Sequence, residues 1–367
     1  MGIHGLNPLI KKYDKNVYKQ CHYTQFSGKS LAMDVSIFLH KYIHTDRNSW
    51  FTQLLNFFVK MQKGNIRIIA VFDGDNVPQE KYLERDCRRN TSDKTVDRLK
   101  EIQAVQELLR VNYINDVGGE YEQSVSENHQ QRVSSILKID VDDVDHDVDF
   151  TNARSLIKEL NKLEDRVENQ AAKVDMGVVE MAKRLVIALG IPHLTAYGEA
   201  EALCASLALH HYVDGVLSRD TDSLVYGTPL FVCDFKQDVF TWTTLKEILD
   251  ALDMTHAQFV DFCIMCGCDY NTNIPAIAAG NAYKKIKEYG SIESYLKTED
   301  KDGTCLRYKR CREIFRPYDK VYLRGYSIPK RKQPNVELLE ELFAINSCNI
   351  PVSHIVKEWE PKLEFVE

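Results

Sequence analysis

The sequence predicts an α/β fold with a mainly parallel central sheet flanked by helices. Short β-branched apolar runs alternate along the chain with stretches of helical periodicity, which is typical of parallel strands joined by helices. Several of these runs end in an acidic residue. With 367 residues, 44% apolar and 28% charged, the chain has the composition of an ordinary globular protein and can bury a large core.

The first strand and helix are predicted within residues 30–43. A short apolar run at residues 30–36 contains Asp34 and continues into the helical pattern of residues 37–43. Residues 66–74 are β-branched and apolar and close with Asp-Gly, a turn signal. They predict a second, buried strand.

The region that follows carries more charge. Residues 78–106 alternate basic and acidic side chains and predict a helix, and the pattern loosens over residues 111–174. Within it, residues 140–149 are mostly acidic. A calcium site there would need the glycine and closing glutamate of an EF-hand loop, which are absent, so we expect a solvated loop.

Regular structure returns in the second half. Residues 178–189 have helical periodicity, residues 191–194 are a candidate strand, and a helix begins at 198–202 and runs to Leu209. Two further strands, a helix–loop–helix segment and a helical tail are then predicted, at residues 215–222, 230–234, 255–283 and from 334. The expected organisation has four parts: residues 1–110, 111–174, 175–333 and 334–367.

Charge is distributed unevenly. The net charge is −7, but between residues 284 and 332 fifteen Lys or Arg stand against seven Asp or Glu. Such a region can neutralise the phosphates of a nucleic acid. For any one of these cations, a solvated surface position is the alternative.

The ten cysteines are scattered, and we expect free thiols. Cys263, Cys266 and Cys268 resemble half of a zinc site, but no second pair lies at a finger-like distance, which favours buried core cysteines. No run approaches the roughly 20 apolar residues that a membrane span needs. We expect a protein that stays inside the cell.

Six acidic residues are predicted to converge at one edge of the sheet. Open α/β sheets bind ligands beyond the carboxyl ends of their strands. Four of the acids occupy such ends, and two lie in the first turn of a helix that follows a strand. The six are Asp34, Asp73, Asp220, Asp222, Glu199 and Glu201. Singly, each has an ordinary alternative as a turn, a cap or a helix start.

Converging carboxylates repel one another strongly unless cations lie between them. Mg²⁺ prefers oxygen ligands, and two such ions about 3.5–4 Å apart can hold the attacking and leaving oxygens of a phosphodiester. The acidic pattern therefore points to a magnesium-dependent nuclease.

These motifs resemble the flap endonuclease and Xeroderma pigmentosum G-type (XPG) nuclease family. They occur in family order from residue 1 to about residue 290. The matching segments are 1–6 (MGIHGL), the acidic motifs 33–36 and 71–74, the Glu-x-Glu helix start 198–202, the Asp-x-Asp motif 220–222, and the last acid at 268–270.

The resemblance implies a PIN-like nuclease core with a helical arch and a helix–hairpin–helix-like DNA-binding element. It implies a first Mg²⁺ held by Asp34, Asp73, Glu199 and Glu201. It implies a second Mg²⁺ held by Asp220, Asp222 and Asp269. Mn²⁺ can substitute in such sites, and Gly2 would line the same pocket.

The resemblance also implies basic arch residues that steer the scissile phosphate. Lys81 and Arg85 are the candidates because, four residues apart, they would share one helix face. Arg88 or Arg89 could take either role, and plain surface charge is the alternative. Lys284, Lys285 and Lys287 would bind the phosphates of duplex DNA.

Some features depart from the family. Its hairpin turn is glycine-rich and often holds K⁺, whereas residues 274–280 carry alanine where two glycines would permit close backbone approach, which weakens the expectation of K⁺. The region between Asp73 and Glu199 looks longer than in cellular members. Residues 53–58 fail as a sliding-clamp box at Asn56 and predict a core helix. We expect a compact, monomeric, viral-type relative in the nucleus or at a cytoplasmic replication site.

The expected activity is hydrolysis of DNA at 5′ flaps, nicks or junctions during replication, repair or recombination. Two alternatives stay open. A 5′→3′ exonuclease acting on RNA can share a similar acidic α/β core. A non-catalytic DNA-junction binder or scaffold would lack the metal acids, all of which are present here.

Overall fold

The computed structural model describes residues 2–114, 124–138, 148–326 and 328–359, and at 82–85, 87 and 88 it describes the backbone alone. The chain forms two compact units. The sheet unit comprises Met1–Tyr42, Ser49–Arg85 and Val174–Glu367, and the helical unit comprises Ile43–Asn48 and Asp86–Lys173.

The sheet unit is built on a seven-stranded sheet in the order β1-β7-β6-β5-β2-β3-β4. Along this order, β6, β5, β2, β3 and β4 pair in parallel. β7 pairs antiparallel with β6, and β1 pairs antiparallel with β7. The mainly parallel α/β fold is therefore confirmed. The strands are β1 Lys19–His22, β2 Ser30–Asp34, β3 Arg67–Phe72, β4 His193–Thr195, β5 Gly215–Leu217, β6 Leu230–Lys236 and β7 Val239–Thr244.

Apolar side chains of the central strands point alternately into two separate hydrophobic cores. In β2, Leu31 and Met33 belong to one hydrophobic cluster and Ala32 to the other. In β3, Ile68 and Ala70 separate from Ile69 in the same way. Successive residues of a strand face opposite sides, so both faces of this parallel sheet are covered.

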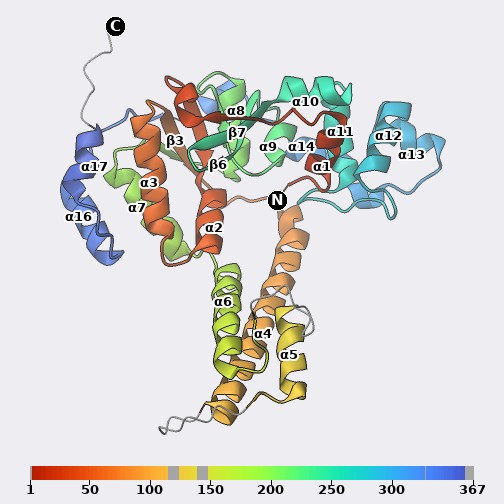
Figure 1. Ribbon diagram of the computed structural model, residues 1–367. Helices are drawn as coiled ribbons and strands as arrows, with labels where there is room; N and C mark the ends of the chain where they lie inside the picture. Colours follow the sequence, from red (N-terminus) through yellow and green to blue (C-terminus); the bar gives the residue numbers. More distant parts are fainter. Residues whose placement is uncertain (1, 115–123, 139–147, 327, 360–367) are drawn as a thin grey trace. The chain divides into compact units, whose positions relative to one another are not determined.

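Helices cover both faces of the sheet (Figure 1). The first core is completed by α2 Val35–Thr45, α3 Trp50–Lys63, α7 Met176–Ala188, α16 Val336–Ile345 and α17 Val352–Trp359. The second is completed by α8 Ala200–Leu209 and α15 Lys320–Leu323. Residues 53–58 lie in α3 with Leu54, Leu55, Phe57 and Phe58 buried, so the predicted core helix is confirmed.

A third cluster lies beyond β6 and contains the helix–loop–helix segment that the sequence predicted. Its two long helices are α11 and α12, separated by the loop of residues 267–278. The helices of this part are α1 Leu6–Tyr13, α9 Asp222–Val225, α10 Leu245–Leu252, α11 His256–Cys266, α12 Ala279–Tyr289, α13 Ile292–Thr298 and α14 Tyr308–Ile314. Short 3-10 turns are η1 Tyr23–Phe26, η2 Gln79–Lys81 and η3 Thr304–Leu306.

The helical unit has its own hydrophobic cluster, formed by α4 Tyr82–Tyr113, α5 Glu127–Leu137 and α6 Ala153–Ala171. The sequence predicted only a loose pattern over residues 111–174, and this was wrong for α5 and α6. The boundary expected near residue 111 falls inside α4. Residues 139–147, most of the predicted acidic loop, lie outside the described residues.

None of the helices in the described part of the chain is both long enough and apolar enough to cross a membrane.

Candidate metal centre

The strand order brings the predicted acids to one edge of the sheet. Asp34 ends β2, Asp73 follows β3, and Asp220 and Asp222 follow β5. Because β2 pairs in parallel with both β3 and β5, these carboxyl ends are neighbours. Glu199 is the N-cap of α8, the helix after β4.

Two more acids complete the group. Glu201 lies in the first turn of α8, and Asp269 lies in the loop after α11. Electrostatic repulsion links the whole set. The charges of Asp73 and Asp220 act on Asp34, those of Glu199 and Asp220 act on Glu201, and that of Asp269 acts on Asp222. We call the seven the acidic cluster: Asp34, Asp73, Glu199, Glu201, Asp220, Asp222 and Asp269.

The acidic cluster is buried to an unusual degree for charged groups. Six of its members are at most 6% exposed, and only Asp73 is exposed. Burial, with the charge of Asp73, raises the pKa of Asp34 from 3.8 to about 8. Burial followed by repulsion from Asp220 raises the pKa of both Glu201 and Asp222 well above the ordinary range. Like charges held this close need positive charge among them.

Hydrogen bonds from two backbone amides and one serine hydroxyl hold three of the carboxylates. Asp73 accepts from the Ala200 amide at 2.8 Å, which ties the end of β3 to the start of α8. Asp34 accepts from the Ser218 hydroxyl at 3.3 Å, and Asp220 accepts from the Asp222 amide at 3.0 Å. These bonds hold the carboxylates in place without neutralising them.

Some oxygens of the acidic cluster have no hydrogen-bond partner. They are Oε1 of Glu201 and both carboxylate oxygens of Asp222, all fully buried. Buried carboxylate oxygens without donors fit the ligand chemistry of hard divalent cations such as Mg²⁺. Among the described residues, however, no three His, Cys, Asp or Glu side chains are already grouped around one point as a metal would require.

Lys81 lies inside the acidic cluster. Its ammonium donates to Glu199 and is 3.4 Å from Oδ2 of Asp269. Burial alone would lower the pKa of Lys81, but Glu201, Glu199 and Asp269 outweigh it and raise the pKa overall. Lys81 is therefore a permanent positive charge among these acids.

Gly2 lies against the same edge. Its backbone adopts φ +88°, and a Cβ there would overlap Oδ1 of Asp220 and the hydroxyl of Thr221. The next amide, of Ile3, donates to that hydroxyl at 2.9 Å. Only glycine fits this close approach to Asp220 and Thr221.

The remaining basic candidates divide into three groups. The side chains of Arg85 and Arg88 lie outside the described residues, and Arg89 is exposed in the helical unit, 4.0 Å from Asp86. Lys285 contacts Glu299 at 3.0 Å and Lys287 contacts Asp253 at 2.6 Å, so both have acidic partners. Lys284 is exposed.

The loop between α11 and α12 adopts a glycine-like backbone conformation at an alanine. Ala276 has φ +66°, a left-handed conformation that disfavours residues with a Cβ. Asn281 donates to its carbonyl at 3.3 Å. The positive φ at an alanine leaves this turn strained.

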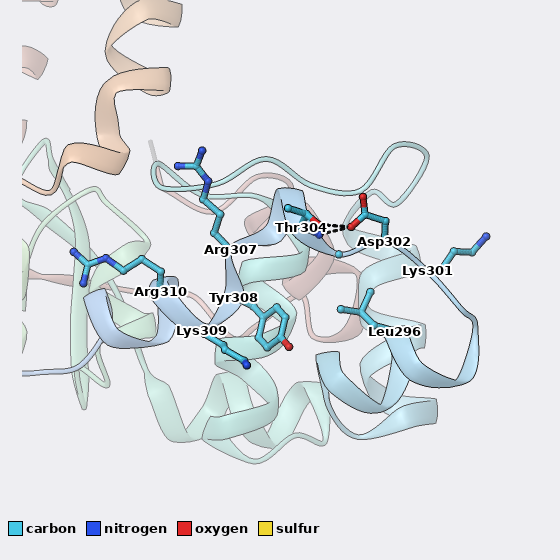
Figure 2. Close-up of a pocket in the computed structure, with 9 residues that line it drawn as sticks. Leu296, Lys301, Asp302, Thr304, Arg307, Tyr308, Lys309 and Arg310 are labelled. Atoms are coloured by element: carbon cyan, nitrogen blue, oxygen red, sulfur yellow. Dashed lines mark hydrogen bonds between the residues drawn. The ribbon is translucent and has the colours of Figure 1, made fainter.

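A basic groove of about 420 Å³ lies farther along the predicted basic region, between α13 and α14. It is lined by Leu296, Lys301, Asp302, Gly303, Thr304, Arg307, Tyr308, Lys309 and Arg310. Figure 2 shows Arg307 and Arg310 extending to one side and the Tyr308 ring and Lys309 to another. Its one acid, Asp302, accepts from the Thr304 amide at 2.9 Å and from the Thr304 hydroxyl.

The basic groove is connected to the acidic cluster through one ion pair. Arg310 contacts Glu80 at 2.7 Å, and Glu80 lies next to Lys81 in η2. The groove therefore helps to fix the short turn that carries the lysine.

Sequence reasoning missed two residues of the site. The Tyr270 hydroxyl donates to Glu199, and the Ser218 hydroxyl donates to Asp34. Both stand within two residues of a predicted acid, in Asp269-Tyr270 and Ser218-Arg219-Asp220, and this proximity was the available signal.

The cysteine prediction is confirmed for the part of the chain that is described. Cys263, Cys266 and Cys268 are buried free thiols, and burial raises the pKa of Cys263 and Cys266. The remaining cysteines with described side chains are free as well.

Comparison with known proteins agrees with this geometry. Residues 1–95 match the XPG N-terminal domain and residues 190–269 match the XPG I-region. The chain is 30% identical to flap endonuclease 1 of Candida tropicalis, with 93% of this chain and 83% of that protein aligned. It is 28% identical to a probable RAD2-like endonuclease of Invertebrate iridescent virus 6, with 87% and 80% aligned.

Solved structures share the fold. The catalytic core of Rad2 in complex with DNA substrate aligns with a TM-score of 0.59 at 17% identity, over 98% of this chain and 99% of that one. Flap endonuclease-1 from Methanococcus jannaschii aligns with a TM-score of 0.58 at 20% identity, over 95% and 96%. Since a 30% identical relative is covered over most of its length, the chain belongs to the XPG and flap endonuclease family of structure-specific nucleases.

Proposed function

We propose that this nuclease hydrolyses DNA phosphodiesters at 5′ flaps, nicks or junctions and that the acidic cluster holds two divalent cations. One observation carries the proposal: seven carboxylates from distant parts of the chain lie at one sheet edge, and buried oxygens of Glu201 and Asp222 have no partner. Nucleases of this family depend on divalent metal. The relatives named flap endonuclease support the flap as substrate.

The seven acids would form two sets of ligands, one for each cation. Asp34, Asp73, Glu199 and Glu201 would hold one cation, and Asp220, Asp222 and Asp269 the other. Such a pair of ions supplies an activated water and stabilises the charge that develops on the phosphodiester oxygens. Mn²⁺ can replace Mg²⁺ in an all-oxygen site.

Lys81 would have two successive roles. Without metal, its ammonium neutralises part of the charge of Glu199 and Asp269. When cations take those oxygens, Lys81 becomes free to donate to a non-bridging oxygen of the scissile phosphate. In the metal-free protein these acids raise the pKa of Lys81, which keeps the proton on its nitrogen.

The remaining parts position the DNA. The exposed cations Arg307 and Lys309 of the basic groove, together with Lys284, can contact backbone phosphates, which carry no sequence information. Selection by DNA shape rather than by base sequence follows from such contacts. We infer that the loop between α11 and α12 contacts duplex DNA without a K⁺ ion, because alanine occupies the positive-φ position 276. We also propose that the protein acts as a monomer.

The test compares cleavage of a 5′-flapped duplex by the wild type, by Asp220→Ala and by Asp250→Ala, with Mg²⁺ and with chelator. Asp250 is the matched control because it is an exposed carboxylate that pairs with Lys246 on the surface. We expect cleavage to require Mg²⁺ and to vanish in Asp220→Ala alone. Unchanged Mg²⁺-dependent cleavage by Asp220→Ala would refute the assignment.

The same assay separates the alternatives. A 5′→3′ exonuclease acting on RNA would degrade single-stranded RNA faster than flapped DNA, with no dependence on the junction. A non-catalytic junction binder would bind the flap substrate and leave it intact at every Mg²⁺ or Mn²⁺ concentration.

A further inference from the structure

A surface of tyrosines lies beside the acidic cluster, and the proposed catalysis leaves it without a role. Tyr318, Tyr322 and Tyr326, spaced four residues apart, form a tyrosine ladder: Tyr322 lies on the short helix α15, Tyr318 just before it and Tyr326 just after it. The ring centroids of Tyr318 and Tyr322 are 4.6 Å apart with an interplanar angle of 31°, and those of Tyr322 and Tyr326 are 5.8 Å apart. Neighbouring rings thus lie at stacking distance.

The ladder is held in place from beneath. The Tyr318 amide donates to the Ser206 hydroxyl at 2.9 Å, and the Tyr318 carbonyl lies 3.0 Å from Nε2 of His210, so α8 anchors its first rung. Leu323 is buried in the second core, and Asp319 caps α15 by accepting from the Tyr322 amide. The rings are therefore arranged before any ligand binds.

The ladder starts next to a predicted metal ligand. The Tyr318 hydroxyl lies 3.9 Å from the position that a Cβ on Gly198 would take, and Gly198 immediately precedes Glu199. Tyr197, on the other side of Gly198, is 59% exposed, and its carbonyl accepts from the Asn76 amide at 3.1 Å. Both features lie within the sheet unit.

Burial in a hydrophobic core does not account for Tyr197 and Tyr322. Tyr318 and Tyr326 pack against the second core, whereas Tyr197 and Tyr322 belong to none of the hydrophobic clusters of the described residues. Tyr322 is 39% exposed. Large exposed aromatic rings of this kind commonly mark a binding surface.

The charges around the ladder favour a polyanion. Lys320 and Arg324 flank Tyr322 on α15 and just beyond it, and both are exposed. In the described part of the chain, no acidic group lies within ion-pair distance of either. Aromatic faces bordered by free cations are the arrangement that proteins use to bind single-stranded nucleic acid.

We propose that Tyr197 and the tyrosine ladder stack the bases of unpaired nucleotides that adjoin the scissile phosphodiester. The proposal rests on the nuclease function above and adds a preference: the enzyme recognises unpaired bases, not merely an unpaired backbone. Every base offers a π-face, so the stacking is independent of sequence. The ligand class is single-stranded DNA that carries its bases.

The test measures binding with the metal chelated, so that no cleavage is needed. Two 5′-flapped duplexes are compared, one with an ordinary flap and one whose flap has the same length but lacks bases. The wild type should bind the ordinary flap at least about fivefold more tightly, the value of one stacked base. A double variant, Tyr197→Ala with Tyr322→Ala, should lose this preference. A fluorescent base analogue in the flap should be quenched by stacking in the complex with the wild type, and this quenching should be lost with the double variant.

Two variants serve as controls. Tyr322→Phe keeps the ring and should keep the preference. Tyr212→Ala removes a ring of similar exposure, 42%, that follows α8 at its far end, and should behave as the wild type. Thermal unfolding of each variant checks that the fold is intact.

Equal affinity of the wild type for the two flaps overturns the proposal. So does a double variant that retains the preference, or one that weakens binding of both flaps equally. These outcomes leave the nuclease function untouched, because cleavage with Mg²⁺ is measured separately. Conversely, loss of cleavage on every substrate would refute the nuclease function without altering the binding result.

Discussion

The acidic cluster buries six like charges at the edge of the sheet, whereas the basic groove keeps its four cations at the surface. In the cluster, burial and then repulsion between carboxylates raise the pKa of Asp34, Glu201 and Asp222. In the groove, Arg307 and Lys309 are surrounded by water and their repulsion is screened. Buried charge of one sign opposes folding and demands a ligand, while exposed charge affects mainly the strength of association.

The largest effect should come from neutralising one buried acid. Asp222→Asn keeps the shape of the side chain but removes a carboxylate from the proposed second cation site, and cleavage should fall about a thousandfold. Without metal, the same variant should unfold at a higher temperature than the wild type, because repulsion is relieved. Steady-state cleavage and thermal melting measure the two effects, with Asp250→Asn as control. A variant that is inactive and also less stable would contradict the comparison.

The next effect should come from removing the one cation inside the cluster. Lys81→Met should reduce kcat about a hundredfold, since one donor to the phosphate is lost. The metal-free protein should lose about 3 kcal/mol of stability because Glu199 and Asp269 lose their counter-charge. Lys246→Met, which breaks an exposed pair, should change neither quantity. Full activity in Lys81→Met would limit its role to folding.

A pH series tests the buried acids without mutation. The folded protein keeps a proton on Asp34 up to about pH 8, whereas the unfolded chain releases it near pH 3.8. The folded state therefore binds more protons in this window, and the free energy of unfolding falls as pH rises, by about 1.4 kcal/mol per pH unit for one proton. Saturating Mg²⁺ should flatten this slope. Stability that rises from pH 5 to pH 8 without metal would exclude the predicted protonation.

The smallest effect should be seen in the basic groove. A double variant, Arg307→Gln with Lys309→Gln, should weaken substrate binding at low salt and reduce the slope of log affinity against log salt by about 1.8, or about 0.9 for each lost phosphate contact. The kcat at saturating substrate should stay unchanged. Salt titrations of binding measure the slope, with Lys246→Gln as control. An unchanged slope would show that Arg307 and Lys309 do not contact DNA phosphates.

The site was predictable to the extent that local pattern determines it. The ends of β2, β3 and β5 are marked by an apolar run that stops at an acid, and the structure places Asp34, Asp73 and Asp220 accordingly. The pairing of Lys81 with Glu199 joins residues 118 positions apart, so no local pattern contains it. Likewise, nothing near Lys287 in the sequence indicates that Asp253 already neutralises it.

The fold was less predictable where tertiary contact decides the structure. β1 is polar and mostly exposed, and it is a strand because β7 pairs with it. In α6 the apolar residues Leu156, Leu160, Leu163 and Val167 do follow a helical period. The same segment is rich in charged residues, and its helix is stabilised where these apolar side chains pack in the cluster shared with α4 and α5.

The alternation of Leu31, Ala32 and Met33 between two cores has a consequence for the evolution of the site. Inserting one residue into β2 would exchange its two apolar faces and turn the Asp34 carboxylate away from its partners. Deletions would do the same. The hydrogen bonds between strands thus fix the relative positions of the acids. Loops can lengthen freely, whereas the strands that carry the acids cannot shift in register by even one residue.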